Sequence, residues 1–182
     1  MLDDIERWVA DARADEAAGE RVRERWLRQQ AEEAGTFAGV LVDLAESSAT
    51  VAVTVTAGRR YLGRIVAVGA DFVALRGENG RLVLLTLAAV ARVRPAPPGR
   101  RVAGEAREVT AAPPPDVTLA DVLAQAVDGR PRLSVHLAGD SLAGELRAVG
   151  ADVLSVSVDG QVSRLAYARL ASVSEISFLD SG

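Results

Sequence analysis

Apolar and polar residues alternate in two segments of the chain, 50–56 and 132–138, and each segment follows a short amphipathic stretch. Alternation with a period of two is typical of a β-strand that buries one face. The preceding stretches, residues 36–45 and 118–127, have apolar residues at helical spacing. Each begins with threonine, which favours the first position of a helix. The pattern therefore predicts a helix followed by strands, twice.

A longer stretch of sequence also occurs twice. The segment Gly63–Asp71 reads GRIVAVGAD, and Gly144–Asp152 reads GELRAVGAD. Further along, Gly80–Val93 can be aligned with Gly160–Val173, so that apolar positions match in both segments. Together with the helix and strand that precede them, these segments define one unit, a helix and about five short strands, that is present in two copies.

Turn signals separate the strands within each copy. Asn79-Gly80 and Asp159-Gly160 both favour tight hairpin turns, because asparagine, aspartate and glycine tolerate the positive φ angles that these turns require. A small sheet of short, strongly bent strands removes its exposed edges by closing on itself. We therefore expect each copy to close into a small barrel.

The rest of the chain flanks these copies. Residues 1–34 are rich in helix formers and contain no proline, which predicts a long charged helix. Residues 95–116 contain six of the seven prolines, and proline cannot donate the hydrogen bonds of a sheet, which indicates a linker. The expected organisation is an N-terminal helix (1–34), a first repeat (35–94), a linker (95–116) and a second repeat (117–180).

The two copies resemble the Sm-like family of small β-barrels, which includes the Hfq-type proteins. Two segments carry the resemblance: the glycine-punctuated strands and acidic turn of Gly63–Leu75, and the apolar closing strands of Leu82–Val93. The resemblance implies a mainly β fold with helices (α+β). In that fold a long N-terminal helix precedes two tandem Sm-like or SH3-like five-stranded barrels, each preceded by a short helix.

The chain departs from the family where RNA is bound. RNA-binding members place a base-contacting asparagine a few residues after the acidic residue. This chain has Ala74 and Leu75 there in one copy, and Ser155 and Val156 in the other. The closing strands also lack the Arg-Gly or Lys-His residues that line RNA pores in the family. The resemblance therefore implies the fold without its RNA-reading residues.

Composition excludes several kinds of chemistry. The chain has no cysteine and a single histidine, His136, so neither thiol catalysis nor a cysteine-based zinc site is available. We interpret His136 as a surface or interface residue, and Asp71 and Asp152 as turn residues that accept backbone N–H bonds. No catalytic residue, metal site or cofactor is expected, and the protein is not predicted to be an enzyme.

The net charge of −4 is unevenly distributed. Residues 1–34 and 116–182 each carry a net charge of −4, whereas residues 35–115 carry +4. The basic middle third is therefore the expected contact for an anionic partner, or a face that pairs with the acidic segments of the chain. The candidate nucleic-acid or partner contacts are Arg59, Arg60, Arg64, Arg76, Arg81, Val66, Val68 and Phe72.

The apolar members of that set follow from strand alternation. Ile65 and Ala67 are expected to face the core of the first repeat. Their neighbours Val66 and Val68, with Phe72, would then form an apolar outer face that packs on the N-terminal helix, the other barrel or another chain. The matching core residues of the second repeat are Leu146 and Ala148.

These patterns favour a non-enzymatic assembly or interaction module that is cytoplasmic and does not bind membranes. The expected partner is a second copy or another protein, because Sm-like barrels pair their open edge strands; the two barrels could also pair within the chain. The alternative is a nucleic-acid (RNA)-binding regulator that uses the basic first barrel. It would show salt-sensitive binding that weakens when Arg59, Arg60 and Arg64 are replaced.

Overall fold

The computed structural model describes residues 35–96, 116–158 and 164–179. The predicted helix of residues 1–34, the Asp159-Gly160 turn and most of the predicted linker lie outside the described residues, and Pro95 is the last residue of a strand. The first repeat contains α2 (Phe37–Glu46), β1 (Thr50–Val55), β2 (Arg60–Val68), β3 (Phe72–Gly77), β4 (Leu82–Thr86), the 3-10 helix η1 (Leu87–Ala89) and β5 (Val90–Pro95). The second contains α3 (Leu119–Ala126), η2 (Val127–Gly129), β6 (Arg132–Leu137), β7 (Ser141–Val149), β8 (Val153–Ser157), β9 (Leu165–Arg169), η4 (Leu170–Ser172) and β10 (Val173–Phe178).

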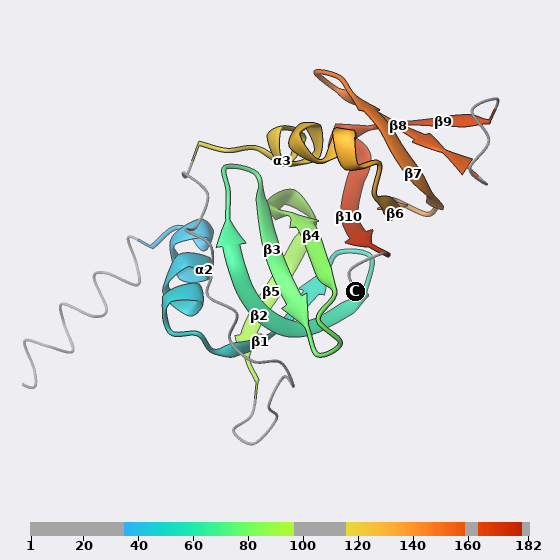
Figure 1. Ribbon diagram of the computed structural model, residues 1–182. Coiled ribbons are helices and arrows are strands. Elements are labelled where there is room, and N and C mark those ends of the chain that lie inside the picture. The colour runs from blue at the N-terminus through green and yellow to red at the C-terminus, as the bar shows by residue number, and fades with distance from the viewer. Residues whose placement is uncertain (1–34, 97–115, 159–163, 180–182) are drawn as a thin grey trace, which may run out of the picture. The chain divides into compact units, whose positions relative to one another are not determined.

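The strands form one ten-stranded antiparallel sheet in the order β5-β1-β2-β3-β4-β10-β6-β7-β8-β9 (Figure 1). Each repeat therefore has the same internal order, with its fifth strand beside its first. The fold is mainly β with two short helices in the described ranges. The prediction of closed barrels is wrong, because β4 pairs with β10 of the other repeat and not with β5 of its own, so the sheet continues instead of closing.

Local signals in the sequence explain the beginning of α3 and the β3–β4 turn. Thr118 caps α3: its hydroxyl accepts the Asp121 N–H at 3.2 Å, while the Asp121 carboxylate accepts the Thr118 N–H at 2.9 Å. This capping box holds the pKa of Asp121 below its ordinary value, mainly through the Thr118 hydrogen bonds. Gly80 turns the β3–β4 hairpin with a φ of 76°, as the Asn79-Gly80 pair predicts.

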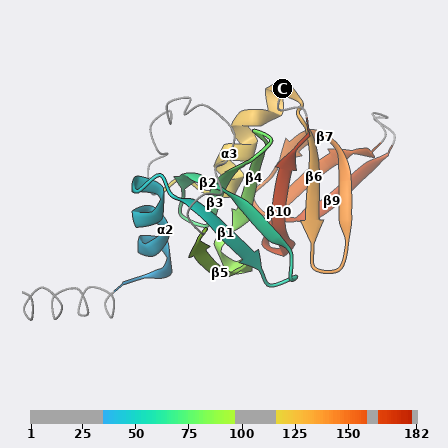
Figure 2. The ribbon, with the colours of Figure 1, turned by 90° about the horizontal axis from the view of Figure 1, so that it is seen from below.

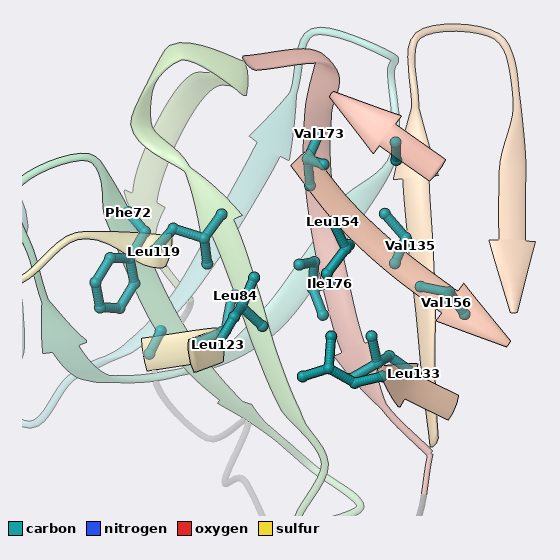
Figure 3. Close-up of a cluster of buried hydrophobic side chains, with 13 residues drawn as sticks. Phe72, Leu84, Leu119, Leu123, Leu133, Val135, Leu154, Val156, Val173 and Ile176 are labelled. Carbon is teal, nitrogen blue, oxygen red and sulfur yellow. The ribbon is translucent and has the colours of Figure 1, made fainter. Parts of the chain in front are cut away.

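Two clusters of buried side chains hold the sheet together. We call the first the first-repeat core, because all of its members come from that repeat: Leu41, Val51, Val53, Val55, Ile65, Val73, Leu75 and Leu85. We call the second the shared core, because Phe72, Ala74 and Leu84 of the first repeat join residues of the second (Figure 3). Its members from the second repeat are Leu119, Leu123, Leu133, Val135, Leu146, Leu154, Val156, Ala168, Val173 and Ile176.

Strand β3 lies between the two cores. Val73 and Leu75 point to the first-repeat core, while Phe72 and Ala74 belong to the shared core, as alternation along a strand requires. All four side chains are buried. The uninterrupted apolar run in this strand therefore reflects burial on both faces, and the second face is covered by the other repeat.

A β-bulge changes which residues of β2 face which core. The pairing of β2 with β3 shifts between Ile65 and Ala67, so alternation breaks at that point. Ile65 is in the first-repeat core as predicted, but Ala67 packs against the shared core together with Val66, and Val68 packs against the first-repeat core. The predicted faces of Ala67 and Val68 are therefore wrong.

The matching bulge in β7 lies between Leu146 and Ala148. Leu146 is buried in the shared core, whereas Ala148 is exposed and Val149 packs against that core in its place. The prediction that Ala148 faces the core is therefore wrong for the same reason. The two repeats keep the bulge at equivalent positions, which indicates that it belongs to the repeated fold.

Hydrogen bonds also correct the alignment of the closing segments. The Asp71 carbonyl accepts the N–H of Leu87, the first residue of η1, and the Asp152 carbonyl accepts the N–H of Leu170, the first residue of η4. Leu87 is therefore equivalent to Leu170, three residues beyond the position that matching Gly80 with Gly160 would give. The extra residues belong to the connection between β8 and β9. None of the described helices is long and apolar enough to cross a membrane.

Candidate functional site

The two repeats are joined where β4 of the first pairs with β10 of the second, a pairing that we call the joint. Figure 2 shows β10 between β4 and β6. Ile176 faces Leu84 across the joint, and both side chains are buried. The Thr86 hydroxyl donates a hydrogen bond to the Val173 carbonyl at 3.0 Å, which adds a side-chain tie beside the main-chain pairing. The joint is therefore apolar on one face.

The other face of the joint holds a buried carboxylate. Glu175, in β10, is only 3% exposed. Its Oε2 accepts a hydrogen bond from the Tyr61 hydroxyl and lies 2.9 Å from Arg59 Nη2, while Oε1 accepts a hydrogen bond from the Ser177 hydroxyl at 2.9 Å. Arg59 and Tyr61 come from the first repeat. A carboxylate of one repeat is thus neutralised by a cation of the other.

Burial dominates the titration of this carboxyl. Loss of hydration raises the pKa of Glu175 above its ordinary value, although the Ser177 hydrogen bond and the Arg59 charge both act to lower it. Burial also lowers the pKa of the neighbouring His136, and the positive charge of Arg59 adds to that effect. Proton binding is therefore favoured at Glu175 and disfavoured at His136.

His136 completes the polar cluster. Its Nδ1 accepts a hydrogen bond from Arg59 Nη1, because a guanidinium can only donate. Its Nε2 lies 3.3 Å from the Ser134 hydroxyl and 3.9 Å from Glu175 Oε1. With Nδ1 used as an acceptor, the ring is neutral and carries its proton at Nε2. The imidazole therefore positions Arg59 and has no free nitrogen for proton abstraction.

A cleft of about 580 Å³ opens beside the cluster. Tyr61 and Glu175 are among its lining residues, and Arg60, Asn79 and Arg81 contribute polar groups from the first repeat. Both arginines come from the basic third of the sequence. The cleft therefore combines a buried acidic group with two cations on its walls.

The predicted contact residues fall into three groups. Arg59, Arg60 and Arg81 lie at the joint or along its cleft. Arg64 and Arg76 face one another across β2 and β3. Val66, Val68 and Phe72 are at least partly buried and pack in the two cores, Phe72 at only 1% exposure.

A second tie between the repeats lies at the beginning of α3. Asp71 Oδ1 accepts the N–H of Leu119 at 2.7 Å, and the Ala70 N–H donates to the Val117 carbonyl at 2.8 Å. The first turn of a helix leaves N–H groups without partners, and a carboxylate there is favoured by the helix dipole. Asp71 therefore accepts a backbone N–H as expected, but from the other repeat.

Sequence reasoning missed Glu175 and Tyr61 as members of a site. Glu175 lies in β10, a strand whose partner β4 belongs to the other repeat, so alternation within one repeat does not show that its side chain is buried. The available signal was its position: a lone acid in a run that is otherwise apolar or small. In the described ranges no group of histidine and carboxylate side chains is arranged to hold a metal ion. The cluster links strands, and its carboxylate is saturated by donors.

The raised pKa of Glu175 leads to a testable prediction about how the unfolding free energy depends on pH. The folded state holds the carboxyl proton more tightly than the unfolded state, so wild-type stability falls as pH rises through the raised pKa. Relative to the wild type, Glu175→Gln should therefore gain unfolding free energy from about pH 4 upward and level off above that pKa. Urea unfolding of both proteins across that range measures the difference.

Arg59, Tyr61 and His136 remain in both proteins, which isolates the carboxyl at position 175. Glu46→Gln, at the exposed end of α2, is the matched loss of one carboxyl. A Glu175→Gln difference that shrinks with rising pH would contradict the assigned direction.

Neither a scan against models of protein families nor a search of curated proteins finds a match for this chain.

Proposed function

We propose that the protein is a non-enzymatic assembly module whose two repeats are Sm-like, and that it binds a second copy of itself through its free sheet edges. One observation carries the proposal. The joint pairs the fourth strand of the first repeat, β4, with the fifth strand of the second, β10. The same two kinds of strand, β9 and β5, are left at the two ends of the sheet. The chain thus contains one paired joint, and its two end strands are the two kinds of strand that would form another.

The order of elements supports the Sm-like interpretation of each repeat. A short helix precedes five strands, the fifth strand pairs with the first, and a three-residue 3-10 helix separates the fourth strand from the fifth. The bulge of the second strand, where the pairing shifts, recurs in both repeats. These features fit an Sm-like repeat that stays open and pairs its edge strands with a neighbour.

The exposed residues of β9 support addition of another strand. Tyr167 is 67% exposed and Leu165 is 39% exposed. The position equivalent to Tyr167 in the first repeat is Leu84, which the joint buries to 1% exposure. An edge strand with exposed large apolar side chains is a site for pairing with another chain. Burial of one such side chain contributes roughly 1.5–3 kcal/mol.

A charge on this edge should weaken association. We expect the wild type to sediment as two or more chains, and Tyr167→Lys to shift it to the monomer, weakening association roughly 10–100-fold. Sedimentation velocity over a range of concentrations measures this. Circular dichroism should remain unchanged, because Tyr167 is exposed and belongs to neither core.

Val40→Lys provides the matched control, since Val40 is an exposed apolar residue that belongs to α2 and to neither edge strand. It should leave the oligomer intact. A wild type that stays monomeric at every concentration would overturn the proposal, and so would an oligomer that Tyr167→Lys does not weaken.

Binding of nucleic acid by the first repeat is the second candidate. Arg60 and Arg81 on the walls of the cleft favour it. Against it, the guanidinium of Arg59 is already paired with Glu175, and the Tyr61 hydroxyl is used by the same carboxylate. The sedimentation experiment repeated after nuclease treatment separates the two candidates, because an oligomer joined by protein strands survives digestion.

A further inference from the structure

Two residues that form the ion pair of the joint, Arg59 and Glu175, each have an equivalent residue in the other repeat, and both equivalents lie near the free edges. Arg59 and Asp140 are equivalent, because their carbonyls accept the N–H of Val55 and of Leu137 in the same loop of each repeat. Arg92 and Glu175 are equivalent, because each lies two residues after the start of the fifth strand. Strand pairing gives the same result. Arg92 faces Thr54 as Glu175 faces His136, and Thr54 and His136 occupy the same position in β1 and β6.

The charges at these positions are reversed between the repeats. Within the chain, Arg59 of the first repeat pairs with Glu175 of the second at 2.9 Å. At the free edges, the second repeat has Asp140 where the first has Arg59, and the first repeat has Arg92 where the second has Glu175. Applying the geometry of the joint to β9 and the β5 of a second copy therefore brings an acid opposite a base again.

We propose that an ion pair between Asp140 of one copy and Arg92 of the next selects the pairing of β9 with β5 over the other combinations of edge strands. The inference rests on the proposed self-association and adds the two charges that specify it. By equivalence with the joint, Arg92 lies opposite Ala168, Val93 opposite Tyr167, and Arg94 opposite Ala166. Val93 then covers the exposed Tyr167 ring as Ile176 covers Leu84.

The same charges disfavour the wrong pairings. If β4 met the β5 of another copy, Arg59 would face Arg92. If β9 met the β10 of another copy, Asp140 would face Glu175. Like charges placed opposite one another in a partly desolvated interface are strongly unfavourable. Of the four ways to combine a fourth strand with a fifth, only the joint and the proposed contact bring opposite charges together.

Both residues are available for such a contact. Asp140 and Arg92 are exposed, and within residues 35–96, 116–158 and 164–179 neither has an ion-pair partner. The Asp140 carboxylate accepts the Ser141 N–H at 2.7 Å through Oδ1, which leaves Oδ2 for a guanidinium. The two side chains are thus complementary in charge, and each is without an ion pair in the part of the chain that the structure describes.

Charge reversal on separate chains provides the test. Asp140→Arg alone places Arg against Arg92, and Arg92→Asp alone places Asp against Asp140. Each variant by itself should associate at least about tenfold more weakly than the wild type in sedimentation velocity at low salt. An equimolar mixture of the two should associate again, because both of its alternating contacts then join opposite charges. Asp128→Arg, an exposed site on η2, is the control for charge alone.

The outcomes separate this inference from the function on which it rests. Restored association in the mixture supports the ion pair, because misfolded variants could not restore association. If the wild type associates but neither variant weakens association, the ion pair is overturned while self-association stands. The same holds if the mixture of variants does not restore association. A wild type that is monomeric throughout overturns both.

Discussion

Replacing Gly144 by alanine is expected to remove about 3 kcal/mol or more of unfolding free energy, the largest loss that we expect from adding a single methyl group. A Cβ at this position would lie 2.2 Å from the Ser157 carbonyl oxygen and 2.8 Å from its carbon. Both atoms belong to the backbone of the neighbouring strand β8, so no side-chain rotation relieves the clash. The strands would have to separate, and urea unfolding followed by circular dichroism measures the cost.

The equivalent Gly63 is expected to behave alike, because its Cβ would lie 2.4 Å from the Arg76 carbonyl oxygen. Gly129→Ala is the matched control, since no atom lies within 4 Å of the Cβ added there. It should change the unfolding free energy by no more than about 0.5 kcal/mol. If Gly144→Ala were as mild as Gly129→Ala, the close approach of β7 and β8 would be contradicted.

The repeated glycine explains why the second strands of the two repeats could be aligned correctly from the sequence. Gly63 and Gly144 align in sequence, and both lie where a backbone carbonyl comes too close for any side chain. Identical residues at such positions are required by sterics, so they mark the same structural place in each repeat. The helix start at Thr118 and the Asn79-Gly80 turn were predictable for another reason, because each depends only on neighbours in the sequence.

The closing strands were harder to place because apolar residues alone do not define a register. Leu82–Val93 is apolar except for Thr86 and Arg92, and the corresponding segment of the second repeat is rich in leucine, alanine and valine, so many apolar matches survive a shift of three residues. The hydrogen bonds of Asp71 and Asp152 to the following 3-10 helices settle the register. Matching Gly80 with Gly160 would place Arg92 at the position of Ser172, whereas the corrected register places it at the position of Glu175.

β-Bulges limited how well the sequence could predict which face of a strand each side chain occupies. Alternation assigns a side to every residue of a strand only while the register is continuous. One extra residue between Ile65 and Ala67 moves every later side chain to the other face, which is why Ala67 and Val68 exchanged places. No residue type in the sequence marks this bulge, so only the pairing with β3 reveals it.

The joint could not be derived from either repeat alone. β4 contributes an apolar strand and β10 contributes a strand with one buried acid, and the partners of that acid, Arg59 and Tyr61, are far from it in sequence. The charge imbalance along the chain pointed in this direction. A basic first repeat and an acidic second repeat are expected to attract one another, and the Arg59–Glu175 ion pair is one place where they meet.

Replacing Ile176 by alanine is expected to cost about 2–5 kcal/mol of unfolding free energy, because Ile176 is fully buried at the joint. It faces Leu84 on one side and Val135 on the other, so the cavity would open in the shared core. Since Phe72 and Leu84 of the first repeat belong to that core, both repeats should lose stability together. Circular dichroism during urea unfolding should still show one transition, moved to lower urea concentration.

Two further variants, one with a smaller change at position 176 and one at an exposed position, make this test specific. Ile176→Val removes one methyl group and should cost about 0.5–1.5 kcal/mol, while Leu165→Ala, on the exposed edge strand β9, should cost far less than Ile176→Ala in the monomer. Two transitions in Ile176→Ala, one of them at the wild-type midpoint, would show that a repeat keeps its stability without the shared core. A single shifted transition means that the repeats fold as one unit, so the joint is a permanent feature of the chain and β5 and β9 are the edges left for a partner.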